Sequence, residues 1–498
     1  MNVDRTTTIT TSAPSASRTW LREWSSLTAV LLAFIYLLTS ILIARHRLFW
    51  YDEVLTVITS SGPTFTSIWR TLARGMDGMP PANYVMVRLF GHLPVAREVS
   101  ARLPSALAMV IGMLITFDCA RRLTDGVHGL IALCLLTCSV LPYYGYEARP
   151  YALYFMFASL ALWLWMNSST SKASALLFGI VIFLAVASHY YAVLCLVPYA
   201  VWEILQWRTP RAPSSRLIAA FVAILLALAL FSRQIAALHQ SSPLVVNVPQ
   251  MVSLVTVFDE LFPYALFPLI GILVLIALIG PKEKETVAGM KESEQLCWLF
   301  ALMPLAGFVV AKLGTNAFAS RYFIGLLPGV AVAFSCLMWR QFRSSRWISV
   351  AALLLFAGLG LGRQLELVRH PAHVRPLTAK TEPERMNAML SLEDKIPATQ
   401  SIVIPSGELL SLEAHYYAKH PEKYVFLLAP HASGPDPQAP LTSGEDRPIR
   451  HWTVEELVAH AKEATLINPS EETIDTLKRA GYKVTGHVDG GLEVVTVE

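Results

Sequence analysis

The sequence contains few charged residues: Asp, Glu, Lys and Arg make up 15% of its 498 residues, whereas hydrophobic residues make up 54%. The mean hydropathy is +0.48. This composition excludes an ordinary soluble globular protein and indicates a polytopic membrane protein. The formal net charge of +4 is small for the length, and no basic tract is present. A nucleic-acid partner is therefore not expected, because it would require clustered Lys and Arg.

Several motifs of common enzyme classes are also missing. The sequence has no GxxxxGK[ST] loop, no GxGxxG after a strand, no HExxH and no GxSxG. The sequence therefore lacks the usual motifs of ATP-driven transport, dinucleotide chemistry and triad hydrolysis. The energy for any reaction must then come from an activated substrate. The cysteines form no CxxC pair and are interpreted as small core residues of apolar segments. They are Cys119, Cys134, Cys138, Cys195, Cys297 and Cys336.

Long apolar runs dominate the chain. A transmembrane helix needs about 20 apolar residues, and this criterion predicts about eleven such helices. They begin near residues 27, 101, 127, 151, 174, 190, 217, 260, 296, 322 and 347. The first run lacks a cleavage site and is interpreted as a retained helix, preceded by a disordered cytosolic tail at 1–26. The short run 83–93, after Pro80-Pro81, is expected to be a re-entrant or interfacial helix.

Basic residues in short loops predict the orientation of these helices. Cytosolic loops are enriched in Lys and Arg, and with a cytosolic N-terminus and eleven spans every second loop carries them. Only Arg45 and Arg47 depart from this rule. The residues expected on the cytosolic side are Arg121, Arg122, Arg208, Arg211, Arg216, Lys282, Lys284, Lys291, Arg340, Arg343 and Arg346. The segments expected on the external side are 45–100, 143–150, 234–258, 314–321 and the C-terminal tail.

The last part of the chain differs from the rest. Apolar runs give way to Pro-rich stretches, such as 430–440, and to alternating strand and helix patterns. We predict a small external α/β domain at 365–498, attached to a transmembrane domain at 27–364 whose first external loop is 45–100. The patterned segments are 401–405, 408–418, 424–428, 454–464 and 484–497.

The first external loop begins with an acidic pair, Asp52-Glu53, flanked by aromatic residues. Carboxylates near lipid cost free energy, so a pair in this place points to chemistry rather than solubility. Desolvation raises the pKa of such a carboxyl group, which makes it a candidate general base for an alcohol. The alternative is a helix cap or an ion pair with Arg45 or Arg47. Asp77 adds another carboxylate to this loop.

Further polar residues are expected on the external face. Arg149 follows Glu147 beside a span, where an arginine can bind phosphate oxygens bidentately. His189 lies between two spans and can hydrogen-bond a phosphate or bind a metal. Arg321, followed by Tyr322, opens a later span and can neutralise a leaving group. Structural alternatives exist, because Tyr is common in aromatic belts and a lone interfacial His is usually structural.

A second acidic pair, Asp259-Glu260, lies at the external end of another span. Nothing in its composition excludes it from chemistry. Its alternative role is to cap the helix that follows.

Taken in order, these motifs resemble those of a known family. They are Asp52-Glu53, Pro80-Pro81 with Tyr84, Ala101-Arg102-Leu103-Pro104-Ser105, Glu147-Ala148-Arg149-Pro150-Tyr151-Ala152, His189-Tyr190-Tyr191 and Ser320-Arg321-Tyr322. Over about residues 20–365 the chain is similar to multi-spanning glycosyltransferases of the C-type superfold that use lipid-linked sugars, especially the bacterial dolichyl-phosphate-mannose-protein mannosyltransferase-like group. It departs from that group at Met79, where His or Lys is frequent, so the acceptor and metal use stay open.

The resemblance implies a mainly α, polytopic membrane helix bundle of this superfold with a small C-terminal α/β extracytoplasmic domain. It implies transfer of a sugar from a polyprenyl-phosphate-linked donor to a lipid, glycan or protein acceptor at the outer face of the plasma membrane, with inversion. Asp52 would take the acceptor proton, and Glu53 would orient either Asp52 or the acceptor. The residues implied in substrate or phosphate binding are Arg102, Glu147, Arg149, His189, Arg321 and Tyr322. No cofactor is implied with certainty, and a divalent metal is an open alternative.

Two other functions stay open from the sequence. A transporter or flippase of lipid-linked sugars would use the same cations to bind phosphate. It should, however, show inverted repeats and polar residues at mid-membrane depth, and no repeat is evident. A membrane-anchored binding or assembly module would instead place its function in the C-terminal domain. Detection of a glycosylated product tests the first alternative, and binding by the isolated domain tests the second.

Overall fold

The computed structural model describes residues 16–167, 171–206, 213–241, 249–280, 290–342, 344–371, 383–405, 409–428 and 450–498. Some expectations from the sequence lie outside these residues. They concern the first fifteen residues of the tail, the Pro-rich stretch 430–440, Arg208, Arg211, Lys282, Lys284 and Arg343.

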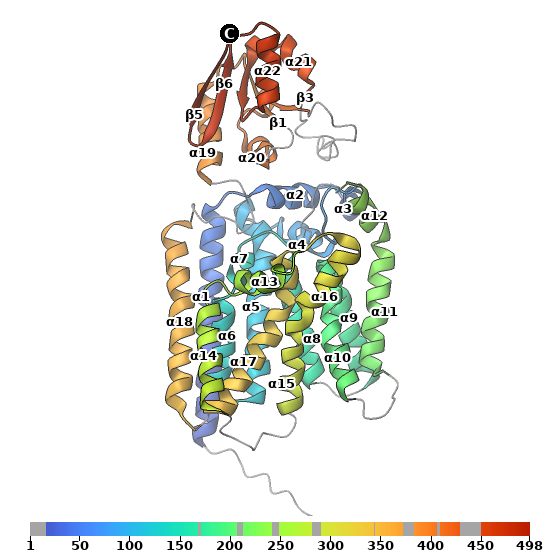
Figure 1. Ribbon diagram of the computed structural model, residues 1–498, viewed down its shortest axis with the longest axis vertical. Helices are drawn as coiled ribbons and strands as arrows, with labels where there is room; N and C mark the ends of the chain where they lie inside the picture. Colours follow the sequence, from blue (N-terminus) through green and yellow to red (C-terminus); the bar gives the residue numbers. More distant parts are fainter. Residues whose placement is uncertain are drawn as a thin grey trace, which may run out of the picture.

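A bundle of helices forms the larger part of the molecule, and a small α/β domain sits at one end of it (Figure 1). The short helices α2, α3, α4 and α12 lie at the bundle end that faces this domain. The bundle elements are α1 (Ala16–His46), α2 (Tyr51–Ser60), α3 (Phe65–Leu72), α4 (Ala82–Phe90), α5 (Arg97–Leu123), α6 (Gly126–Thr137), α7 (Leu141–Gly145), α8 (Tyr151–Asn167), α9 (Lys172–Ser188), η1 (Tyr190–Cys195), α10 (Leu196–Gln206), α11 (Ser215–Leu230), α12 (Ser232–Ser241), α13 (Ser253–Leu261), α14 (Leu266–Ile279), α15 (Met290–Leu299), η2 (Phe300–Leu302), α16 (Met303–Val310), η3 (Ala311–Thr315), η4 (Ser320–Leu326), α17 (Leu327–Phe342) and α18 (Arg346–Arg369).

Every apolar segment predicted from the sequence is helical in the structure. Among the described residues, 5 helices are long and apolar enough to cross a membrane, or 7 if each of two bent pairs counts as one span. The bends are 61° between α11 and α12 and 105° between α13 and α14. The apolar helices α6, α8, α9 and η1 with α10 are shorter. The structure therefore confirms a multi-pass helix bundle, whereas the number of eleven spans stays a prediction.

Helix α1 begins earlier than expected, at Ala16. Residues 16–26, which we expected to belong to a disordered tail, are therefore helical. The short run 83–93 matches α4, which is too short to span a membrane. It lies with α2 and α3 across the end of the bundle (Figure 1). The choice between a re-entrant and an interfacial helix stays a prediction.

Four of the basic residues expected in cytosolic loops lie at one end of the bundle. Helix α18 leads into the α/β domain, so its start at Arg346 and the preceding end of α17, with Arg340, lie at the opposite end (Figure 1). Helix α5 runs away from the domain and finishes with Arg121 and Arg122. These basic residues thus lie together, remote from the domain, as the loop pattern predicted.

Two glycines allow close packing around α8. At Gly325, in η4, an added Cβ would lie 2.4 Å from the Tyr154 hydroxyl. At Gly112, in α5, it would lie 2.5 Å from the Phe155 ring. Both separations are far shorter than a normal contact between heavy atoms. Only glycine therefore lets η4 and α5 approach α8 this closely, as small residues do at helix contacts in membranes.

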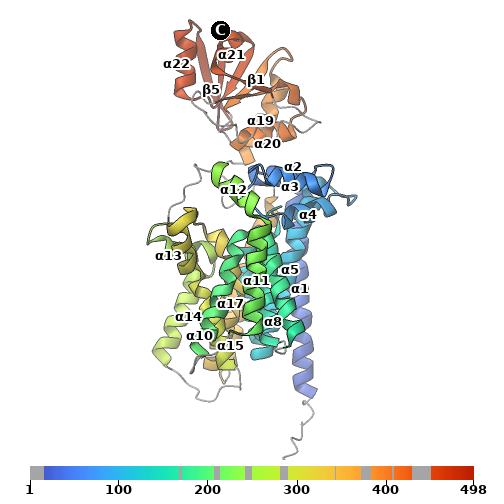
Figure 2. The same cartoon turned by 90° about the vertical axis from the view of Figure 1, so that its right-hand side faces the viewer.

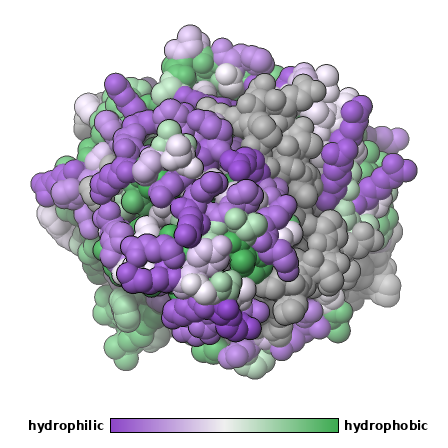
Figure 3. All heavy atoms as spheres, turned by 90° about the horizontal axis from the view of Figure 1, so that it is seen from above, coloured by the Kyte–Doolittle hydropathy of each residue, from purple (hydrophilic) through white to green (hydrophobic). Residues whose placement is uncertain are grey.

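Apolar side chains cover the sides of the bundle. Leu225 and Leu226 on α11 and Leu354 on α18 are exposed. Viewed from above, the α/β domain is mainly hydrophilic, and hydrophobic residues show chiefly at the rim (Figure 3). Apolar sides with a polar cap are the distribution expected of a bundle surrounded by lipid.

The C-terminal domain contains a six-stranded sheet with strand order β3-β2-β1-β4-β6-β5. The first four of these strands are parallel, whereas β6 runs antiparallel to β4 and β5. The helices lie around this sheet (Figure 2). The elements are α19 (Pro383–Lys395), β1 (Ser401–Pro405), α20 (Leu409–Tyr417), η6 (Pro421–Lys423), β2 (Tyr424–Leu427), β3 (Arg450–Trp452), α21 (Val454–Ala459), η8 (Ala461–Glu463), β4 (Ala464–Ile467), α22 (Glu471–Arg479), β5 (Val484–Asp489) and β6 (Leu492–Val497). The α/β character predicted for this region is confirmed.

Candidate active site

The acidic pair lies at the start of α2, at the bundle end that faces the C-terminal domain. Trp50, with extended backbone (φ −92°, ψ 170°), precedes the helix. Asp52 and Glu53 therefore occupy the first turn, where the helix dipole favours carboxylates. Successive helical residues project about 100° apart, so the two carboxylates point in different directions. Each belongs to a different cluster of charges.

Glu53 is fully buried and bound on several sides. Its Oε1 accepts from Arg102 Nε at 2.7 Å and from the backbone N–H of Ala148 at 2.8 Å. Its Oε2 accepts from Arg102 Nη2 at 2.7 Å and from Arg47 Nη2 at 3.2 Å. Arg47 Nη2 also lies 3.4 Å from Glu147 Oε1. We call Arg47, Glu53, Arg102 and Glu147 the anchor cluster.

The anchor cluster is sealed from solvent, since each of its side chains is at most 3% exposed. Burial raises the pKa of Glu53, but the charges of Arg102 and Arg47 outweigh burial and lower the pKa below its ordinary value. Burial also raises the pKa of Glu147, to about 7, because Arg47 offsets it only in part. Glu53 therefore stays ionised at neutral pH, whereas Glu147 titrates there.

Arg102 has no donor left for a substrate. It also donates to the carbonyl oxygens of Ala44, Arg47 and Leu48, so that all N–H groups of its guanidinium are used. The phosphate contact expected of Arg102 and the orienting role expected of Glu53 are therefore corrected. Both residues hold the end of α1 against α2 and α5.

Two other expectations change with this cluster. Glu147 faces Arg47 rather than a substrate, although it had been a candidate for substrate binding. Arg47 departed from the loop pattern of basic residues. The structure explains the departure, because Arg47 is buried as the partner of two glutamates.

Asp52 belongs to a second, more open cluster. Its side chain is 26% exposed, and its Oδ2 lies 3.5 Å from Arg149 Nη2. Arg149 Nη1 donates to Asp77 Oδ2 at 2.6 Å, to the Thr56 hydroxyl at 3.1 Å and to the Asp52 carbonyl at 3.1 Å. One guanidinium thus holds two carboxylates from different segments. Its Nε is buried without a hydrogen-bond partner among the described residues.

His189 lies between α9 and η1, among aromatic rings. Its Nδ1 accepts the backbone N–H of Tyr191 at 3.2 Å, so the proton of a neutral imidazole is assigned to Nε2. That Nε2 is buried, and within the described part of the chain it has no partner. The ring stacks on Tyr154, with centroids 5.5 Å apart. Burial and the charges of Arg321 and Arg149 lower the pKa of His189 to about 3. It is therefore a neutral donor at physiological pH.

Arg321 is half-buried at the start of η4. Its guanidinium lies 5.5 Å from the centre of the Tyr322 ring, and Tyr322 itself stacks on Tyr191 at 4.6 Å. Its Nε is buried and lacks a hydrogen-bond partner among the residues that the structure describes. Arg321 also forms no ion pair with a carboxylate of those residues. This arginine therefore keeps its donors available for an anion.

Electrostatic interactions connect these side chains. Burial raises the pKa of Asp52, Arg149 and Arg321 oppose that shift, and Asp77 adds to it. The same two arginines act on His189. We call Asp52, Asp77, Arg149, His189 and Arg321 the open cluster. The structure thus brings together four of the predicted site residues, with Tyr322 beside them.

The open cluster does not fit a divalent cation. Among the described residues, no three His, Cys, Asp or Glu side chains are grouped to hold a metal ion. Asp52 and Asp77 both face the guanidinium of Arg149. Its positive charge takes the place that a cation would need between the two carboxylates.

The rival acidic pair lies elsewhere. Asp259 and Glu260 are exposed in the last turn of α13. They do not cap the start of the next helix, which was the alternative role considered for them. The dipole at a helix end does not favour carboxylates there.

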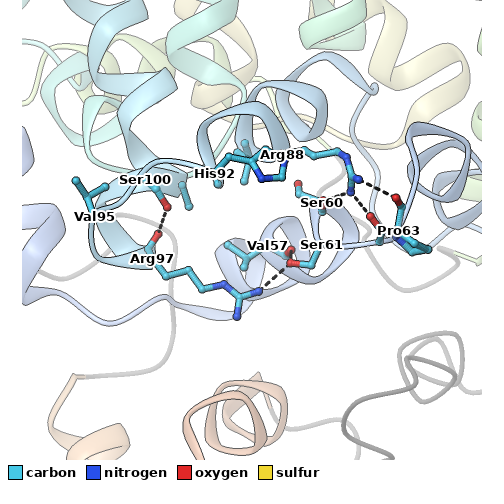
Figure 4. Close-up of a pocket in the computed structure, with 13 residues that line it drawn as sticks. Val57, Ser60, Ser61, Pro63, Arg88, His92, Val95, Arg97 and Ser100 are labelled. Atoms are coloured by element: carbon cyan, nitrogen blue, oxygen red, sulfur yellow. Dashed lines mark hydrogen bonds between the residues drawn. The ribbon is translucent and has the colours of Figure 1, made fainter.

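A cavity of about 520 Å³ lies between the end of α2, the end of α4 and the start of α5 (Figure 4). No residue of the open cluster lines it. Its arginines are engaged with the protein, because Arg88 donates to the carbonyl oxygens of Ser60 and Pro63 and Arg97 donates to the Ser61 hydroxyl. This cavity is therefore separate from the candidate site.

Two important residues were absent from the predicted site. Asp77 shares Arg149 with Asp52, but it lies in an irregular loop where its charge was the only signal. Arg47 fixes Glu53. Its signal was present in the sequence, because a basic residue on the unexpected side of the membrane indicates a specific partner.

The comparisons with known proteins agree with this picture. Residues 79–236 match the model of the dolichyl-phosphate-mannose-protein mannosyltransferase family. The matched region contains Arg149 and His189, whereas Asp52 and Arg321 lie outside it. Among curated proteins, no sequence matches the chain.

The fold is similar to that of ArnT from Cupriavidus metallidurans. The structure of ArnT bound to undecaprenyl phosphate has 12% identity and a TM-score of 0.61, and the match covers 96% of this chain and 98% of that one. The apo structure has 14% identity and a TM-score of 0.61, with 97% and 98% covered. The match to the family model agrees with the resemblance seen in the motifs, and the two ArnT structures confirm the predicted fold class. At this identity the structural likeness shows the fold alone.

Proposed function

We propose that this protein is a membrane glycosyltransferase that moves a sugar from a polyprenyl-phosphate-linked donor to an acceptor, by inverting displacement. The observation that carries the proposal is the composition of the open cluster. It combines a partly exposed carboxylate, Asp52, with two cations and a neutral donor, Arg149, Arg321 and His189. A transfer from a phosphate leaving group needs both kinds of group close together.

Asp52 is the base in this mechanism. Burial raises its pKa, which makes its carboxylate a better proton acceptor, while the charge of Arg149 opposes that shift and holds the side chain in place. The acceptor hydroxyl gives its proton to Asp52 as its oxygen forms a bond to the anomeric carbon. The bond from that carbon to the phosphate oxygen breaks on the opposite face, which inverts the configuration.

Arg321 and His189 receive the leaving group. The phosphate gains negative charge as the glycosidic bond breaks, and polyprenyl phosphate departs with the bonding electron pair. Arg321 offers a guanidinium whose Nε has no partner among the described residues, and His189 offers its buried Nε2–H. Donors that are already oriented toward developing charge stabilise a transition state strongly. Tyr322 positions Arg321 through its ring face.

The fold match supports a lipid phosphate as the leaving group, because the ArnT structure with the same fold is described as bound to undecaprenyl phosphate. We further propose that the open cluster works at the outer face of the plasma membrane. The basic residues at the other end of the bundle support this orientation.

The test is transfer by the purified full-length protein in liposomes. The protein is incubated with a panel of synthetic polyprenyl-phosphate sugars and with a cell-envelope extract as acceptor. Mass spectrometry then detects released polyprenyl phosphate and a glycosylated product. Both should form with the wild-type protein and disappear with Asp52→Asn and with Arg321→Ala.

Asp259→Asn is the matched control, because it removes an exposed carboxylate from the same end of the bundle. It should transfer sugar at the wild-type rate. Donor movement across the bilayer without any product would contradict the proposal and support a flippase. Full transfer by Asp52→Asn would remove Asp52 from its assigned role.

A further inference from the structure

The C-terminal domain contacts the chain directly beside Asp52. Glu413 of α20 accepts the backbone N–H of Tyr51 at 2.6 Å, and Tyr51 is the residue that precedes Asp52. One helical turn later, the Tyr417 hydroxyl accepts the backbone N–H of Phe49 at 2.7 Å. Residues four apart lie on the same face of a helix. One face of α20 therefore holds the segment that leads into α2.

The start of α2 needs such partners. The first N–H groups of a helix have no acceptor within the helix, and Trp50, at the N-cap position, provides no side-chain hydrogen bond. Glu413 supplies a carboxylate at this position from another domain. Its side chain is 3% exposed, so the bond to Tyr51 is protected from competition with water.

Apolar and charged contacts extend this junction. The Phe49 ring lies 6.0 Å from that of Tyr416, and Tyr416 also lies 5.3 Å from the Arg97 guanidinium. The Tyr417 hydroxyl donates to Glu98 Oε1 at 3.3 Å. The domain is thus attached both to the start of α2 and to the start of α5.

We propose that the C-terminal domain positions the reacting carboxylate, with Glu413 and Tyr417 as positioning residues. This inference rests on the function proposed above. Asp52 follows Tyr51 directly, so a displacement of the Tyr51 backbone moves the Asp52 side chain relative to Arg149 and the acceptor. A misplacement of about 1 Å lowers an enzymatic rate on the order of 100-fold. The domain thereby acts on catalysis without contacting the reacting atoms.

The test measures both catalysis and local structure in the full-length protein. Glu413→Ala should lower kcat about 10- to 100-fold, while the KM for the donor and the affinity for polyprenyl phosphate stay unchanged. Hydrogen exchange at the Tyr51 amide should become about tenfold faster or more, because its acceptor is lost. Glu413→Gln should largely retain the wild-type kcat and the protection of the Tyr51 amide, since the glutamine side-chain oxygen still accepts the hydrogen bond from that amide.

Tyr417→Phe provides a second test if Glu413→Ala fails to fold. Tyr417→Phe should speed hydrogen exchange at the Phe49 amide and lower kcat by a smaller factor than Glu413→Ala does. Matched controls are Glu456→Ala, which removes a carboxylate that accepts a backbone N–H at the start of α21, and Tyr482→Phe, which removes a hydroxyl bound to Val458 within the domain. The hydrogen bonds that these substitutions remove both lie within the domain, so both variants should keep kcat and protection at Tyr51.

Unchanged kcat and unchanged Tyr51 protection in Glu413→Ala would overturn the inference, as would an equal loss in Glu456→Ala. The exchange measurement needs no sugar transfer. If the wild-type protein transfers no sugar while exchange at Tyr51 responds to Glu413→Ala, the function fails and the contact stands. If transfer occurs and depends on Asp52 but not on Glu413, only the positioning role fails.

Discussion

The anchor cluster and the open cluster begin at adjacent residues of one helix, yet their chemistry is opposite. In the anchor cluster every donor of Arg102 is used and Glu53 has partners on both oxygens. In the open cluster, Arg321 and His189 each keep an N–H group without a partner in the described part of the chain, and Asp52 is partly exposed. Among the described residues, Arg47 Nη1 is the one buried donor of the anchor cluster without a partner, whereas Arg149, His189 and Arg321 of the open cluster each have one. A nearly saturated charge network stabilises a structure, whereas an unsaturated one is available to a substrate. The number of free donors therefore separates structure from function better than the number of charges.

The largest effect is expected from breaking the anchor cluster. Arg102→Ala leaves Glu53 as a buried and poorly compensated charge, which should lower the free energy of unfolding by about 3–5 kcal/mol. Thermal melting in detergent measures this loss. Arg122→Ala on the same helix is the control. Arg122 forms an ion pair with Asp118, but its side chain is 45% exposed, so the pair contributes only about 0–1 kcal/mol to stability. Equal melting temperatures of the Arg102→Ala and Arg122→Ala variants would contradict the structural role of Arg102.

Removal of a cation from the open cluster should affect rate instead of stability. Arg321→Gln keeps the fold but loses the charge that faces the leaving phosphate, so kcat should fall about 100- to 1,000-fold. Steady-state kinetics and melting on the same preparation test this separation. A decrease in melting temperature as large as that of Arg102→Ala, with little change in kcat, would instead give Arg321 a structural role like that of the anchor cluster.

His189 should give a smaller effect that does not depend on pH. His189→Phe keeps a ring among its aromatic neighbours but removes the Nε2–H, so kcat should fall about 10- to 100-fold, the value of a hydrogen bond to a charged group. The pKa of His189 is lowered to about 3, so the imidazole stays neutral at higher pH. The fold-decrease in kcat should therefore be the same at every pH above about 5.5. A loss confined to pH values below about 6.5 would show instead that the imidazolium is the active form.

The smallest effect is a shift in the pH profile. Asp77 raises the pKa of Asp52 and competes for Arg149. In Asp77→Asn both effects disappear, so the pKa of Asp52 should fall. A base must be deprotonated to act, and the acid limb of kcat/KM should therefore move to lower pH. Movement to higher pH would contradict the arrangement of the open cluster.

The sequence predicted the components of the site but not their division into two clusters. Asp52, Arg149, His189 and Arg321 could be found because polar residues at the ends of apolar segments are few and costly. Glu53 and Arg102 satisfy the same criterion. What separates them is the direction of each side chain and the number of its donors that are satisfied. Neither property is visible in a linear pattern.

The fold was predictable to a similar extent. Apolar length located the long helical segments of the bundle but not the short helices α2, α3, α7 and α12. Four of the apolar segments are shorter than a full span, so length alone does not give the number of crossings. In the C-terminal domain the segment 484–497 is a hairpin that turns at Gly490 and Gly491, both with positive φ. Asp489-Gly490 is a known hairpin signal, and it had been available in the sequence.

The contact between Glu413 and Tyr51 was beyond sequence reasoning. These residues are 362 positions apart, and Glu413 lies in no recognisable motif. Their pairing follows from the placement of α20 on the end of the bundle. Contacts between domains of this kind require the three-dimensional arrangement.

The most direct measurement is the turnover of purified Asp52→Asn with the affinity for polyprenyl phosphate determined on the same sample. Asparagine preserves the shape of the side chain and removes its ability to take a proton. We predict a turnover lowered about 1,000-fold with an affinity and a melting temperature like those of the wild-type protein. Turnover within about twofold of wild type, a change too small for loss of a general base, would contradict the account.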